Sequence, residues 1–133
     1  MAFVLDASIA VGWVIAAQAS AYGRRIRLRA RREPYHAPTL WRLEVVNAVR
    51  SLERRRAMAP DAAEVAVDIL DRMQPIFHEA AMPLADSLKL ARRFELSAYD
   101  ASYLALALEL RLPIACTDGA LRSMLGRAGV KLA

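Results

Sequence analysis

Short strand-like runs recur between helical stretches along this chain of 133 residues, and this alternation constrains its fold more than any other feature. The strand-like runs cover residues 3–5, 35–37, 76–78 and 114–116, with a possible edge strand at 130–132. Helical patterns cover residues 8–16, 19–32, 39–56, 60–73, 84–94 and 97–110, and a short helix follows residue 118. Strands that alternate with helices predict a parallel sheet covered on both faces. Because no repeat or Gly/Ser linker interrupts the pattern, we expect one domain over residues 1–133.

Two acidic residues follow expected strands. Asp6 comes directly after the first strand, and Asp118 follows the fourth strand by one intervening residue. In a parallel sheet of this kind, ligand sites form at the carboxyl ends of the strands, so both acids are expected at one edge of the sheet. Each acid could instead stabilise the start of a helix through the helix macrodipole.

Glu44 lies on the expected helix at residues 39–56, on a face that is mostly apolar. The residues three and four positions away from it are Leu40, Trp41, Asn47 and Ala48. A carboxylate removed from water without a partner is strongly unfavourable or shifts its pKa. We therefore expect a cation near Glu44.

Asp100 lies in the first turn of the expected helix at residues 97–110. Its helical neighbours include Ser97, Tyr103 and Leu104. Ser97 and Asp100 also have the spacing of a capping box, which is the structural alternative to a functional role.

Several carboxylates brought together repel one another and partly protonate unless a hard divalent cation neutralises them. Oxygen ligands without a His or Cys cluster favour Mg²⁺ or Mn²⁺ over Zn²⁺. His36 and His78 lie in strand-like segments and are not expected to bind a metal. The single cysteine, Cys116, is expected to be a buried apolar residue.

Apolar residues make up 56 % of the chain, which leaves material for a subunit interface. Trp13 and Tyr22, on the first two expected helices, are candidates for a contact with another subunit or a partner protein. No apolar run reaches the ~20 residues of a membrane span, and no leader precedes the first strand. We therefore expect a cytoplasmic protein that does not contact a membrane.

Four segments carry a family resemblance in their order along the chain: residues 4–8 with Trp13, residues 43–48, residues 96–107, and residues 117–118 with Leu121. They resemble the motifs of PIN-domain ribonucleases, in particular the VapC toxin type of bacterial and archaeal toxin–antitoxin pairs. The run Ser97-Ala98-Tyr99-Asp100-Ala101 is the most specific part. The resemblance covers nearly the whole chain.

The resemblance implies a three-layer α/β/α sandwich of the PIN type with a short, mainly parallel central sheet. It also implies a metal-dependent endoribonuclease whose acidic quartet is Asp6, Glu44, Asp100 and Asp118. Asp6 and Asp100 match the principal Mg²⁺ ligands, and Mn²⁺ could replace Mg²⁺. The polar positions that would orient the acids or a water molecule are Ser8, Asn47 and Thr117. Helix capping is the alternative role for Ser8 and Thr117.

The resemblance further implies an RNA substrate, a cognate antitoxin and a homodimer. Hydrolysis by a metal-activated water would leave a 5′-phosphate and a 3′-hydroxyl. In one respect the chain departs from many relatives, which carry acids just after the first helix. This chain has Gln18-Ala19-Ser20 there, followed by arginines.

Basic residues exceed acidic ones, giving a net charge of +5, and only Lys89 and Lys131 of 19 basic residues are lysines. The expected helix at residues 19–32 carries Arg24, Arg25, Arg27, Arg29, Arg31 and Arg32. A basic balance suits a polyanion partner, although compositional bias is an equal alternative. Of these side chains, Arg24, Arg25, Arg27 and Arg31 could contact RNA phosphates or an acidic antitoxin segment, or the helix could present a solvated face.

Two other functions stay open. A catalytically inactive PIN-like module could bind RNA or act as a scaffold. A phosphatase of the haloacid-dehalogenase type also places an Asp after its first strand, but it requires a second Asp two residues later, where this chain has Ser8.

Overall fold

A parallel sheet forms the middle layer of the fold. The computed structural model describes residues 1–117 and 119–133, and within them the sheet has four strands in the order β3-β2-β1-β4. The strands are β1 (Phe3–Leu5), β2 (Tyr35–Pro38), β3 (Ile76–His78) and β4 (Ile114–Ala115), and each neighbouring pair is parallel. The apolar strand β1 is fully buried because helices cover both faces of the sheet.

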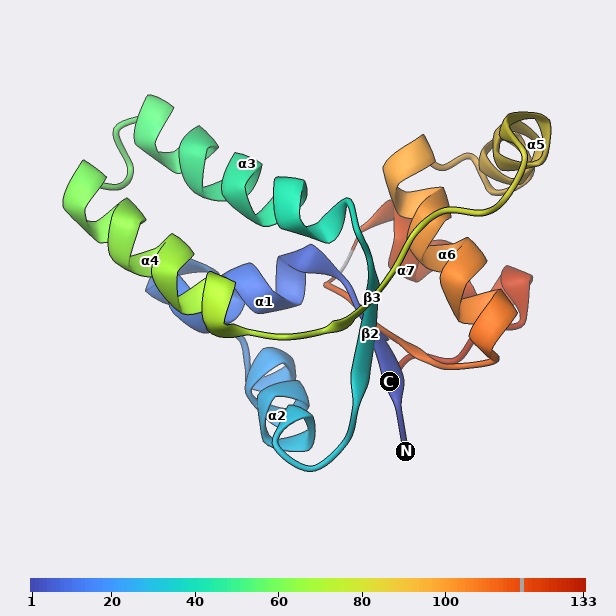
Figure 1. The fold of residues 1–133 in the computed structure, drawn as a ribbon, viewed down its shortest axis with the longest axis horizontal. Helices are drawn as coiled ribbons and strands as arrows, with labels where there is room; N and C mark the ends of the chain where they lie inside the picture. Colours follow the sequence, from blue (N-terminus) through green and yellow to red (C-terminus); the bar gives the residue numbers. More distant parts are fainter. Residues whose placement is uncertain (118) are drawn as a thin grey trace.

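Helices form the two outer layers. They are α1 (Ala7–Val14), α2 (Ala21–Ala30), α3 (Trp41–Arg54), α4 (Pro60–Arg72), α5 (Leu84–Phe94), α6 (Ala98–Leu110) and α7 (Ala120–Ala128), with a 3-10 turn η1 at Ala16–Gln18. Figure 1 shows α1 to α4 on one side of the sheet and α5 to α7 on the other. This is the three-layer α/β/α sandwich that the sequence predicts.

Several helices begin at other residues than expected. Helix α1 starts directly after Asp6, whose carboxylate accepts a hydrogen bond from the Ser8 amide, so Asp6 rather than Ser8 is the N-cap. Helix α2 starts at Ala21 because the Ser20 hydroxyl caps the Gly23 amide at 2.9 Å. The long helix α3 begins at Trp41, two residues after Thr39.

Two strands also differ from the sequence prediction. Pro38 is the last residue of β2, and Cys116 follows the end of β4. The expected edge strand at residues 130–132 is reduced to a single parallel bridge between Leu132 and Ile114. Cys116 is buried, as the sequence predicts.

The aromatic side chains of the first two helices pack within the chain. Trp13 Nε1 donates a hydrogen bond to the Gly23 carbonyl at 2.8 Å, and the Tyr22 hydroxyl donates one to the Ala133 carbonyl at 3.0 Å. Both rings are half-buried against the core, so they are less available for another protein than the sequence suggests. In the part of the chain that the structure describes, no helix has the length and apolar character needed to cross a membrane.

Candidate active site

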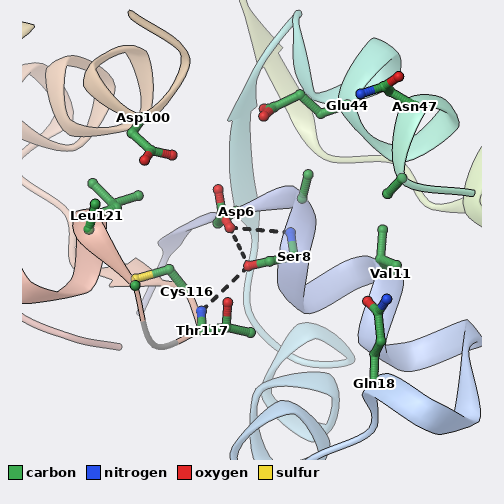
Figure 2. Close-up of a pocket in the computed structure, with 14 residues that line it drawn as sticks. Asp6, Ser8, Val11, Gln18, Glu44, Asn47, Asp100, Cys116, Thr117 and Leu121 are labelled. Carbon is green, nitrogen blue, oxygen red and sulfur yellow. Dashed lines mark hydrogen bonds between the residues drawn. The ribbon is translucent and has the colours of Figure 1, made fainter. Parts of the chain in front are cut away.

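A cavity of about 450 Å³ opens where β1 and β4 end and α3 and α6 begin (Figure 2). Its lining comprises Asp6, Ala7, Ser8, Val11, Gln18, Glu44, Asn47, Ala48, Asp100, Cys116, Thr117, Gly119, Ala120 and Leu121. The lining includes three of the four expected acids, Asp6, Glu44 and Asp100. It also includes the three expected polar residues, Ser8, Asn47 and Thr117. Asp118, the fourth expected acid, lies outside the described residues.

Asp6 is placed by the end of β1. Its amide donates a hydrogen bond to the Ala115 carbonyl at 2.9 Å, which extends the pairing of β1 with β4. Its carboxylate Oδ2 accepts hydrogen bonds from the amide of Ser8, at 3.2 Å, and from the Ser8 hydroxyl. The Ser8 hydroxyl oxygen in turn accepts one from the Thr117 amide at 3.4 Å. Ser8 therefore orients Asp6, and Thr117 contributes its backbone.

Asp100 faces Asp6 across the cavity. The Ser97 hydroxyl accepts a hydrogen bond from the Asp100 amide at 3.1 Å, so the expected cap starts α6 and holds Asp100 in the first turn. Figure 2 shows both carboxylates directed into the space between them. Burial raises the pKa of Asp100. Burial also raises the pKa of Asp6 despite the Ser8 hydrogen bonds, and the charge of Asp100 raises it further.

Glu44 has a hydrogen-bond partner within the protein, and the cation expected beside it stays a prediction. Its Oε1 accepts a hydrogen bond from the Tyr103 hydroxyl at 2.6 Å. Burial raises the pKa of Glu44, the Tyr103 hydrogen bond opposes that change, and the charges of Asp6 and Asp100 raise the pKa further. Sequence reasoning missed this contact, although Tyr103 is one helical turn from Asp100 and is a polar group in an apolar stretch.

Gln18 reaches the cavity through a tight turn. A Cβ atom on Gly12 would lie 2.8 Å from the Gln18 carbonyl oxygen, closer than real Cβ atoms come, so the turn requires glycine at residue 12. Figure 2 shows Gln18 at the rim, beside Val11. Residue 18 thus lies beside the site and contributes an amide.

The donor set suits a hard cation. The described acids offer oxygen atoms only, and three of them share one cavity. Burial raises the pKa of all three, and the charges of neighbouring acids raise those of Asp6 and Glu44 further. As the side chains lie, no group of three His, Cys, Asp or Glu within residues 1–117 and 119–133 could hold a metal together. Mg²⁺ keeps several waters and often uses only one or two carboxylates, so Asp6 and Asp100 fit its chemistry.

Other candidate groups lie elsewhere. His36 Nδ1 and His78 Nε2 form a hydrogen bond with each other at 2.9 Å between β2 and β3, and neither ring lines the cavity. The expected contact residues Arg24, Arg25, Arg27 and Arg31 are exposed on or next to α2 and do not line it either. Within the described residues, one of the arginines at residues 24–32 forms an ion pair. It is Arg29, whose Nη2 lies 2.9 Å from the Glu33 carboxylate.

The sequence profile of the PIN domain family matches residues 3–124, and the chain belongs to this family, whose members are generally metal-dependent nucleases. A solved structure titled "Crystal structure of PAE2754 from Pyrobaculum aerophilum" has a similar fold, with a TM-score of 0.64 and 24 % sequence identity. The similarity covers 97 % of this chain and 90 % of that one. Among curated proteins, no match is found.

Proposed function

We propose that the chain is a Mg²⁺-dependent endoribonuclease that acts as the toxin of a type II toxin–antitoxin pair, of the VapC type. The observation that carries this proposal is the cavity in which Asp6, Glu44 and Asp100, from three separate elements, face one another with raised pKa values. A fold gains nothing from such repulsion unless a cation compensates it. Membership of a nuclease family supports the same conclusion.

In this proposal Asp6 and Asp100 hold Mg²⁺ or Mn²⁺, and Glu44 and Asp118 complete the acidic site. The ion, when bound, neutralises charge on the phosphate and activates water. Ser8 fixes the orientation of Asp6 through its two hydrogen bonds. Asn47 and Thr117 line the cavity with polar groups that can bind water or RNA.

Cleavage of RNA by the purified chain tests the enzymatic part. We expect cleavage with Mg²⁺ or Mn²⁺, none with a chelator, and products with 5′-phosphate and 3′-hydroxyl ends. Sequencing the new 5′ ends identifies the preferred sites. Products with 2′,3′-cyclic phosphates, or cleavage that persists in chelator, would exclude a metal-dependent hydrolysis.

The toxin role has a separate test. Expression of the chain should arrest growth, and coexpression of a small protein encoded beside it should restore growth by binding the chain. When the same protein is coexpressed with an inactive variant of the chain, growth does not depend on neutralisation, so binding between the two proteins is tested separately. If no neighbouring product binds the chain, the antitoxin part of the proposal fails while the nuclease part remains.

A homodimer is also proposed. Large apolar side chains are exposed on α5, where Leu84 is 89 % and Leu88 52 % exposed, and on α3, where Leu43 is 75 % exposed. Light scattering on the purified chain measures the mass directly. A monomer at all concentrations would contradict this part.

An inactive RNA-binding or scaffold module remains the second candidate. The observation that favours it is that the described side chains form no ready group of three metal-binding residues. Such a module would bind RNA and leave it intact with every divalent ion, so the cleavage assay separates the two functions.

A further inference from the structure

Tyr103 connects two of the segments that build the acidic cavity. Its side chain is 0 % exposed, and it stands on α6 one turn after Asp100. The hydroxyl donates a hydrogen bond to Glu44 Oε1 at 2.6 Å, across 59 residues of sequence. One hydroxyl thus joins α6 to α3.

Packing alone does not require this hydroxyl. A phenylalanine would fill the same space in the core, and burying a phenol is unfavourable unless its hydroxyl is hydrogen bonded. Tyr103 bonds to a carboxylate of the candidate site, whereas Tyr22 bonds to the backbone carbonyl of Ala133. Burial and the nearby acids raise the pKa of Tyr103 far above its usual range, so the hydroxyl remains a donor.

The Glu44 side chain has several rotatable bonds, and its position would vary without an anchor. A hydrogen bond to a carboxylate is shorter and about twice as strong as one between neutral groups. Figure 2 shows the Glu44 carboxylate extending from α3 toward Asp6 and Asp100. The anchor occupies one oxygen and leaves the other available.

We propose that Tyr103 is a positioning residue that fixes the Glu44 carboxylate for binding of a divalent cation. The inference rests on the proposed function, since it concerns the same site. It assigns a role to a residue outside the acidic quartet and the polar residues that the sequence singled out.

Calorimetric titration of the full chain with Mn²⁺, without RNA, tests the inference. We expect Tyr103→Phe to weaken Mn²⁺ binding by about 10-fold, as is typical when a hydrogen-bond partner of a ligand is lost. Tyr22→Phe is the matched control, because it removes a tyrosine hydrogen bond to a backbone carbonyl instead of the one to Glu44. It should change Mn²⁺ affinity by less than about twofold, as should Tyr99→Phe on the exposed face of α6. The melting temperature of each variant in chelator records any structural loss separately.

A double variant tests whether Tyr103 acts through Glu44. In the Glu44→Gln background, Tyr103→Phe should not weaken Mn²⁺ binding further, because the carboxylate it positions is gone. The double variant can also be measured if Tyr103→Phe alone does not fold. Loss of the Tyr103 hydroxyl leaves the Glu44 carboxylate without its hydrogen-bond donor, and Glu44→Gln removes that negative charge.

The outcomes separate the inference from the proposed function. If the parent binds Mn²⁺ and Tyr103→Phe binds it equally well, or if the double variant loses a further 10-fold, the inference is wrong and the metal site stands. If Tyr22→Phe weakens binding as much as Tyr103→Phe, the effect is general destabilisation and the inference is also wrong. If the parent binds no Mn²⁺, the proposed function fails and the inference with it.

Discussion

The acidic cavity and helix α2 each gather side chains of one charge, in opposite environments. Asp6, Glu44 and Asp100 come from separate elements, are half-buried, and have raised pKa values because burial removes water from them. The arginines at residues 24, 25, 27, 31 and 32 follow one another on and after a single helix and are exposed. Water screens the charges of the exposed arginines, whereas it is partly excluded from the acids of the cavity.

The comparison shows which cluster needs an explanation beyond composition. Adjacent arginines on an exposed helix repel by only a few tenths of a kcal/mol per pair, so α2 is stable whether or not it has a partner. Carboxylates that the fold itself brings together in a partly buried cavity are unfavourable without a compensating charge. The cavity therefore indicates a ligand more strongly than the arginines do.

The largest expected effect is loss of RNA cleavage in the cavity variants. Asp6→Asn and Asp100→Asn should each reduce the rate by roughly 100-fold or more, because a bound metal contributes several kcal/mol and each 1.4 kcal/mol is tenfold. Glu44→Gln should reduce it strongly but less. Rates are measured on a defined RNA, with circular dichroism to verify folding.

Asp61→Asn is the matched control for Asp100→Asn, since Asp61 is an exposed acid in the first turn of α4. It should cleave at the parent rate. Full activity in Asp100→Asn would remove the basis for treating the cavity as the catalytic region.

The next effect concerns the arginines. If Arg24, Arg25, Arg27 and Arg31 contact phosphates, changing them to glutamate should weaken RNA binding by about tenfold or more. It should also flatten the slope of log affinity against log salt by about 0.7 per lost contact on a single strand. Binding is measured in the Asp100→Asn background so that the RNA stays intact. If they contact the antitoxin instead, only the complex with that protein weakens.

The arginine run at residues 54–56, exposed at and after the end of α3, provides the control for total charge. Reversing those three charges should change RNA affinity less than reversing the arginines of α2. Equal losses at both places would mean that net charge, and not α2, attracts RNA. No loss at either would make α2 a solvated face.

A smaller effect is stabilisation by the metal. Mg²⁺ or Mn²⁺ should raise the melting temperature by several degrees, because an ion that binds only the folded state adds about 1–3 kcal/mol when it is well above its Kd. Scanning calorimetry with and without chelator measures the change. Asp100→Asn should lose most of the response, and a parent with no response would have no metal site in the cavity.

The smallest effect is the pH dependence of stability in chelator. A carboxyl whose pKa is raised by folding binds protons better in the folded state, so it destabilises the fold above that pKa. The destabilisation disappears as the pH falls below the unfolded value of about 4. Asp6→Asn should thus melt about 1–2 °C above the parent at pH 7. The difference should shrink as the pH is lowered.

Asparagine also caps helices well, so the Asp6 variant retains the start of α1. The opposite result is that the parent melts above Asp6→Asn at pH 7 in chelator. The Ser8 hydrogen bonds would then stabilise the charged Asp6 carboxylate more than burial destabilises it, and the acids of the cavity would not destabilise the fold.

Local patterns allowed much of the fold to be predicted. The bounds of α5 and β3 agree with the expected segments, and the Ser97 cap that holds Asp100 at the start of α6 is present. The N-cap of α1 is Asp6, two residues before the expected Ser8, because both side chains can cap and only the observed hydrogen bonds distinguish them. The η1 turn was missed because its alanines carry no sequence signal for a helix break.

What the sequence by itself determined is the order of strands and helices and the position of Asp6 and Asp100 at element ends, because periodicity and capping depend on near neighbours. Only the tertiary structure decided that Glu44 is held by Tyr103, that Gln18 reaches the cavity past Gly12, and that the arginines of α2 do not line the cavity. The contact between Glu44 and Tyr103 joins residues 59 positions apart. It exists because α3 packs against α1 and α6 packs against β1, which brings their first turns to one edge of the sheet, and no local pattern encodes that distance.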